Sequence, residues 1–213
     1  MLTFSRKTKI ILFTLFFLAL LFVYAWPRLG LWIVEQDTFD HADLAVVLSG
    51  NPVQRSLAAR DLYLQRKIDR VLIIPEPRDQ TIEKEMIKLG LKDPHKKTVP
   101  TSEAILVKSG VPKTAIAFFP QPVDGTILEA PAIHNFLEGH MPKKMVVITS
   151  RFASRRACTI FRQVFKNDPV DIFCSPTSYD SFNPKKWSEK PRDALYVLME
   201  YQKLVVNFFT LNF

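Results

Sequence analysis

The chain has little glycine, cysteine or histidine, and each shortage argues against a class of site. Its 213 residues include six glycines, two cysteines and four histidines. There is no Gly-x-Gly-x-x-Gly or Walker loop for a nucleotide, and no Gly-x-Ser-x-Gly elbow for a serine nucleophile. The histidines lack metal-ligand spacing, so we expect neither a metal nor a cofactor. Two cysteines cannot form a disulfide framework, and Cys158 and Cys174 either pair or are separately buried.

One long apolar run lies near the N-terminus. Residues 10–26 follow Arg6, Lys7 and Lys9, whereas only Arg28 comes directly after the run. The run predicts a single transmembrane anchor, with interfacial residues continuing to position 34. The charge difference places the N-terminus in the cytoplasm and the rest outside it, which in a bacterium means a single-pass inner-membrane protein with a periplasmic domain. A signal peptide cleaved after Ala25 is the alternative, and it would also export the domain.

Residues 35–213 predict one extracytoplasmic α/β domain. Short apolar runs at 44–48, 71–74, 116–119, 145–149 and 170–174 are typical of strands buried on both faces. Helix-like segments lie between them at 52–66, 102–108, 126–137 and 152–165. This alternation predicts a doubly wound, mostly parallel, Rossmann-like sheet behind the N-terminal transmembrane helix.

Two segments depart from this alternation. The proline-containing stretch at about 76–101 is interpreted as an insertion or lid around a short helical piece at 82–89. The segment 191–209 has apolar residues at helical spacing, and it packs either on the sheet or on the membrane surface. Its aromatic end, which includes Phe208, Phe209 and Phe213, is either part of the core or an interfacial contact, and we expect the core.

The formal charge of +8 includes the positive residues that precede the anchor, so the exported part is moderately basic. Such a surface favours anionic lipid headgroups or phosphorylated ligands as partners. A solvated basic surface next to an anionic membrane explains the same charge equally well. We expect no nucleic-acid partner, because the exported domain has no nucleic-acid motif.

Polar residues follow three of the predicted strands. A parallel sheet binds its ligands at the carboxyl ends of its strands, so these residues are candidates for a site. Hydroxyl and glycine residues directly before a helix leave backbone N–H groups free to hold an anion. Arginines early in the first and fourth helices add guanidinium groups, although 151, 155 and 156 cannot all face one way. Ordinary helix capping is the alternative. The candidate ligand-binding residues are Ser49, Gly50, Asn51, Arg55, Thr126, Glu129, Thr149, Ser150, Arg151 and Arg156.

Two glutamates begin predicted helices. Glu103 and Glu129 would form an acid/base pair if they converged on this site. A glutamate in a first helical turn is otherwise only a partner of the helix dipole. No catalytic residue follows from the sequence.

A series of short motifs runs in order along the chain. It comprises Ala42 to Gly50, then Arg55 with Ala59 and Leu62, Ser102-Glu103-Ala104, Gly110-Val111-Pro112, Thr126 with Glu129-Ala130, and Val147 to Phe152 with Arg156-Ala157. This ordered series resembles the ElyC/SanA/YdcF family of bacterial envelope proteins. The resemblance implies a Rossmann-like domain with a pocket at the strand ends. It also implies a role in envelope integrity or in the metabolism of lipid-linked cell-wall and surface-glycan precursors.

The chain differs from the family pattern at two places. Ala153 stands where the family usually has a histidine, the natural general acid or base. Pro75-Glu76-Pro77 follows the second strand where relatives commonly have Ser-Gly-Gly. Both changes are compatible with a divergent binder that has lost catalysis.

Three functions are therefore left open. The first is an anchored envelope protein that binds an anionic or phosphorylated ligand, acting as a hydrolase or transferase at a phosphate if it is an enzyme. The second is a non-catalytic envelope scaffold. The third is a binder of S-adenosylmethionine or a nucleotide.

Overall fold

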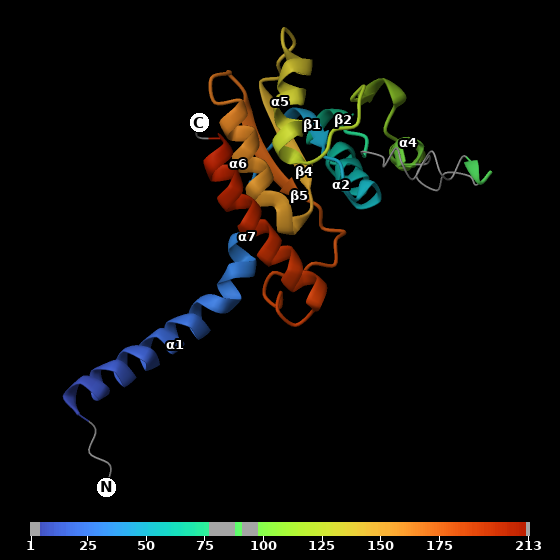
Figure 1. Cartoon of the computed structure of the whole chain (residues 1–213). Helices are drawn as coiled ribbons and strands as arrows, with labels where there is room; N and C mark the ends of the chain where they lie inside the picture. The colour runs from blue at the N-terminus through green and yellow to red at the C-terminus, as the bar shows by residue number, and fades with distance from the viewer. Residues whose placement is uncertain (1–4, 77–87, 91–97, 212–213) are drawn as a thin grey trace.

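The computed structural model describes residues 5–76, 88–90 and 98–211, and it confirms a doubly wound α/β fold (Figure 1). The order β3-β2-β1-β4-β5 shows that the chain builds outward from β1, returns to the centre and builds outward on the other side. All four pairings are parallel. The strands are β1 (Ala42–Val47), β2 (Ile68–Ile73), β3 (Ile116–Phe118), β4 (Lys144–Thr149) and β5 (Asp171–Pro176).

Helices cover both faces of the sheet. α2 (Pro52–Leu64) and α4 (Thr98–Lys108) cover one face, and α5 (Thr126–Leu137) and α6 (Ser154–Val164) cover the other. The short helices η1 (Lys113–Ala115) and η2 (Arg151–Ala153) precede β3 and α6. The closing helix α7 (Pro191–Leu211) packs on α6 and η2 rather than directly on the sheet. Most of the predicted insertion at 76–101, including residues 82–87 of the helical piece predicted at 82–89, lies outside the described residues.

The apolar runs become strands because both of their faces are buried. Along β1, Leu44 and Val46 pack towards α5 and α6, whereas Ala45 and Val47 pack towards α2 and α4. β4 repeats this alternation, and its apolar residues are completely buried. A strand covered on both sides needs apolar residues at every position, which explains the continuous runs in the sequence.

The N-terminal helix α1 (Arg6–Trp32) is long and apolar enough to cross a membrane. At about 1.5 Å per residue it is about 40 Å long, enough for a bilayer core and one interface. Its apolar side chains from Ile10 to Tyr24 point into the surroundings, whereas Gly30 is buried against the domain. A Cβ at Gly30 would overlap the Trp187 ring and the carbonyl oxygen of Pro184, so the close approach requires glycine.

Several contacts join the last turns of α1 to the domain. The Trp187 indole donates a hydrogen bond of 3.0 Å to the carbonyl oxygen of Trp26, and the Tyr201 hydroxyl donates one of 3.1 Å to that of Leu29. The ring of Trp32 stacks on Tyr201 with centroids 5.5 Å apart. All three residues of α1 follow Ala25, so cleavage there would leave these contacts in place.

The two cysteines form a disulfide that ties α6 to β5. Cys158 and Cys174 have Cα atoms 6.1 Å apart, and both side chains are completely buried. The structure thus favours pairing between the two alternatives that the sequence leaves open. A disulfide also fits an oxidising compartment.

Candidate functional site

A cavity of about 340 Å³ lies at the carboxyl ends of β1 and β4, where the strand order reverses. Open parallel sheets bind their ligands at this position. The lining comes from the strand ends, the first turns of α2, α5 and α6, the short helix η2, and α7. The residues are Ser49, Arg55, Gly125, Thr126, Ile127, Glu129, Thr149, Phe152, Ala153, Arg156, Glu200, Lys203 and Asn207.

Arg55 joins the loops that follow β1 and β4. Its guanidinium donates to the carbonyl oxygens of Leu48, at 3.0 Å, and Ser49, and to the Ser150 hydroxyl, at 3.0 Å. The side chain is buried, and burial lowers the pKa of Arg55 to about 10. Most of its donors are therefore used to hold the site together rather than to bind a ligand.

Gly50 is the residue that lets the β1 loop fit closely around this guanidinium. Its φ is +102°, a conformation that side chains disfavour, and a Cβ there would lie 3.1 Å from both terminal nitrogens of Arg55. Gly50 therefore shapes the wall behind the cavity instead of lining it.

Glu129 is a nearly completely buried carboxylate in the first turn of α5. It accepts a hydrogen bond of 2.7 Å from the backbone N–H of Ser49. Burial raises the pKa of Glu129, and this effect exceeds the opposing contributions of the Ser49 hydrogen bonds and of Arg55 and Arg156. Because its pKa is raised, this buried carboxyl group can exchange a proton closer to neutral pH than an exposed glutamate can.

A chain of three charges crosses from α6 to α7. The guanidinium of Arg156 lies 2.6 Å from the carboxylate of Glu200, which is buried, and Lys203 lies 3.4 Å from the same carboxylate. The Lys203 side chain is about half exposed at 47%. Two cations thus share one carboxylate, and Lys203 is the more exposed of the two.

Two helix N-termini at the cavity have no side-chain cap. The N-cap residues are Gly125 for α5 and Ala153 for α6, and neither makes a side-chain hydrogen bond. By contrast, Asn51 caps α2 itself, because its side chain accepts a hydrogen bond of 3.4 Å from the N–H of Gln54. At the start of α6, however, the N–H groups of Ser154 and Arg155 donate to the carbonyl oxygens of Arg151 and Ile33. Of the three predicted helix ends, the start of α5 is therefore the one best placed to offer N–H groups to an anion.

The structure brings six of the ten sequence-predicted residues to the cavity and places four elsewhere. Ser49, Arg55, Thr126, Glu129, Thr149 and Arg156 line it. Gly50 and Ser150 lie behind Arg55, and Asn51 caps α2. Arg151 points to Asp180, which accepts its backbone N–H at 2.7 Å and lies 3.8 Å from its side chain.

Two other charged residues also lie apart from the cavity. Glu103 pairs with Lys113 at 3.3 Å, so Glu103 and Glu129 do not converge. Arg155 pairs with Glu35 at 3.3 Å and lies 4.7 Å above the Trp32 ring, at the end of α1.

Sequence reasoning missed the contribution of α7. Glu200, Lys203 and Asn207 recur at positions i, i+3 and i+7, which places them on one side of the helix. The available signal is this polar stripe in an otherwise apolar helix. The amide nitrogen of Asn207 is buried and has no hydrogen-bond partner among the described residues.

A second hollow, of about 380 Å³, lies next to the cavity. It shares Arg156 and Asn207 with the cavity and continues between α6 and α7 past Ile160 and Leu204. Trp32 and Phe208 also line it. We call this hollow the α6–α7 groove; it extends from the two residues that it shares with the cavity to Trp32, where α1 meets the domain.

Other hollows and clusters are less suited to ligands. A wider depression of about 620 Å³ contains Asp37 and Asp61, which are already bound to Arg162 and Arg60. Two groups in the described part of the chain have ligand atoms close enough for a metal: Glu35 with Asp37 and Cys174, and His41 with Asp43 and Asp69. The first includes a disulfide sulfur, and in the second Asp43 accepts the N–H groups of Lys143 and Lys144.

Comparison with known proteins does not identify a family. No protein-family model matches the chain, and no curated protein matches it.

Proposed function

We propose that this protein is a membrane-anchored binder of an amphiphile with a phosphate or similar anionic headgroup. The observation that carries the proposal is that the two hollows are neighbours, since Arg156 and Asn207 line both. The headgroup would occupy the polar cavity, and the chain of the ligand would lie in the α6–α7 groove. Because the groove ends at Trp32, the chain would approach from the membrane side of the domain.

The headgroup would meet three kinds of donor. Lys203 and Arg156 supply positive charge, and the uncapped end of α5 supplies backbone N–H groups. The amide nitrogen of Asn207 supplies a buried donor at the junction with the groove. An anion would compete with Glu200 for both cations, so Glu200 sets the strength of binding.

Protonation of Glu129 would also favour the anion. Its raised pKa means that the neutral form persists to a higher pH than in an exposed glutamate. If the bound ligand reacts, hydrolysis or transfer at the phosphate is the chemistry we propose. The ionised form of Glu129 would then accept a proton from the attacking water or hydroxyl as its oxygen bonds to phosphorus, and the leaving oxygen would take up that proton as its bond to phosphorus breaks. Ala153 also lines the cavity, at the position where the family that the chain resembles has a histidine.

The location we propose is the bacterial inner membrane, with the α/β domain on the periplasmic side. The cluster of Arg6, Lys7 and Lys9 before the apolar run supports this orientation. A role with lipid-linked cell-wall or surface-glycan precursors would suit both the anchor and the two hollows. That role rests on the resemblance to envelope proteins.

Binding of hexyl phosphate to the full-length protein in phosphatidylcholine nanodiscs tests this proposal. Calorimetric titration, with empty nanodiscs as background, should show tighter binding of hexyl phosphate than of inorganic phosphate or hexanol. Lys203→Ala should weaken binding by about tenfold, because it removes an accessible cation. Glu200→Gln should strengthen binding, because it frees Arg156 and Lys203.

The matched control is Lys113→Ala, which removes an exposed lysine paired with Glu103 outside the cavity. It should leave the Kd for hexyl phosphate unchanged. A non-catalytic scaffold predicts that all three variants are silent. Equal Kd values in wild type, Lys203→Ala and Glu200→Gln would reject the cavity as the headgroup site.

A further inference from the structure

α7 carries a large apolar face that points away from the domain. Its six residues are between 47% and 59% exposed: Leu195, Leu198, Met199, Val205, Val206 and Phe209. They occur at positions i, i+3, i+4, i+10, i+11 and i+14, which lie on one side of a helix. The stripe is about 21 Å long at 1.5 Å per residue.

The opposite side of α7 already holds the helix to the domain. Val197 is completely buried, and Glu200 and Asn207 face the cavity. The outward face is therefore not needed to dock α7. A soluble domain rarely exposes a continuous apolar stripe of this size unless the stripe has an occupant.

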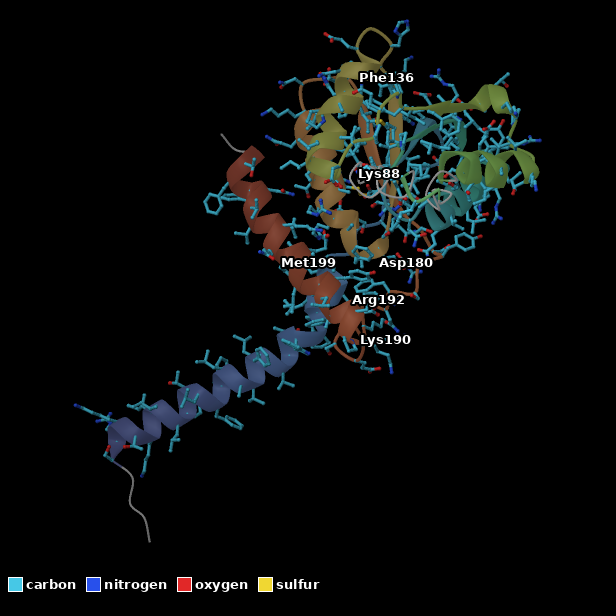
Figure 2. The ribbon with its side chains drawn as sticks, turned by 45° about the vertical axis from the view of Figure 1, so that its right-hand side comes forward. Lys88, Phe136, Asp180, Lys190, Arg192 and Met199 are labelled. Carbon is cyan, nitrogen blue, oxygen red and sulfur yellow. A yellow bond between two sulfur atoms is a disulfide. The ribbon has the colours of Figure 1, made fainter. Side chains whose placement is uncertain are left out.

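The arrangement of α1 and α7 indicates what the occupant is. The last turns of α1 pack on α7 through Trp32 and Tyr201. Both figures show α7 running transverse to α1, across the side of the domain from which α1 leaves (Figures 1 and 2). If α1 crosses a bilayer, α7 lies along the bilayer surface.

Positive charges mark the same side of the domain. Lys185, Lys186, Lys190 and Arg192 are exposed in the loop before α7 and in its first turn. Figure 2 shows Lys190 and Arg192 close to the place where α1 joins the domain, with Met199 farther along α7. Basic residues close to the surface of a membrane are attracted to anionic lipid headgroups.

We infer that α7 is an interfacial helix whose outward face is buried in the lipid bilayer. The occupant is lipid, because the face is continuous with the contact between α7 and a helix that is long and apolar enough to span the membrane. The domain then has two membrane contacts, α1 through the bilayer and α7 along it. This inference does not depend on the ligand proposed above.

Spin labels on α7 test this inference in the full-length protein. Leu198→Cys and Val205→Cys provide two sites on the outward face, and Leu128→Cys provides a matched control on α5. Leu128 is also an apolar helix residue, 57% exposed. All three side chains point into the surroundings, so their replacement leaves the core unchanged.

The protein is reconstituted in phosphatidylcholine vesicles containing phosphatidylglycerol, and label accessibility to oxygen and to a water-soluble nickel complex is measured. Labels at 198 and 205 should be more accessible to oxygen, as in lipid, and the label at 128 to nickel. Equal nickel accessibility at 198 and 128 would overturn the inference. Spin–spin broadening at 198 that disappears on dilution with unlabelled protein would also overturn it, because a second copy would then cover the face.

Discussion

Replacing Arg55 by alanine should destabilise the domain far more than replacing the neighbouring arginine of the same helix. The guanidinium of Arg55 donates to two carbonyl oxygens of the β1 loop and to the Ser150 hydroxyl of the β4 loop. All three acceptors are at least partly buried. Without Arg55 they lose their donor, and the two loops lose their connection.

The size of the effect follows from these contacts. Hydrogen bonds to a charged donor are worth about 1.5–3 kcal/mol each. Part of this gain offsets the cost of burying the guanidinium, so we expect a net loss of about 3–5 kcal/mol, as for other broken buried polar contacts. In a domain of this size that corresponds to a decrease in Tm of about 6–20 °C.

Arg60→Ala is the matched control in α2. Arg60 pairs with Asp61 at 2.6 Å, but both side chains are partly exposed, so the loss should be at most about 1 kcal/mol. Urea unfolding of the full-length protein in detergent, followed by circular dichroism, measures both variants. If Arg55→Ala lost no more free energy of unfolding than Arg60→Ala, Arg55 would not connect the loops.

Two further predictions concern buried groups on the face of the sheet that α5 and α6 cover. Burial raises the pKa of Glu129, so ionisation of this carboxyl group destabilises the folded state. The stability that the neutral group contributes is present below the unfolded pKa of 4.5, and it is lost as pH rises through the folded pKa. Glu129→Gln should remove this loss from the dependence of the urea midpoint on pH, whereas an identical dependence in both proteins would contradict the role of burial. Replacing both Cys158 and Cys174 by serine opens a link between residues 16 positions apart, and should cost about 3 kcal/mol of unfolding free energy. The same loss should follow reduction of the wild-type protein, and a variant as stable as the oxidised wild type would show that the link contributes nothing.

The sheet could be predicted from the sequence because strands buried on both faces need continuous apolar runs. All five predicted strands are present, and their parallel order follows from the helices between them. The beginning of α4 was placed too late, at 102 instead of Thr98. Helix ends depend on local contacts that periodicity does not report.

The site was only partly predictable because it depends on helix geometry and on distant segments. The short helix η2 moves the start of α6 to Ser154, so Arg151 faces Asp180 whereas Arg156 enters the cavity. Glu200 and Lys203, which lie more than 40 positions after Arg156 in the chain, reach the cavity from α7. No local sequence pattern connects these two residues with β1.

The expectation that the aromatic end of α7 lies in the core was wrong for Phe208 and Phe209, which are 65% and 59% exposed. Phe213 lies outside the described residues. Aromatic residues are equally typical of a core and of a membrane interface, so composition alone does not distinguish the two.

Native mass spectrometry of the full-length protein, extracted gently from its own membrane, is the most direct test of the binding proposal. We predict a co-purifying mass of a lipid that carries a phosphate. It should be retained in Lys113→Ala and much reduced in Lys203→Ala. A bare protein mass in the wild type, or the same bound mass in wild type and Lys203→Ala, would contradict the proposal.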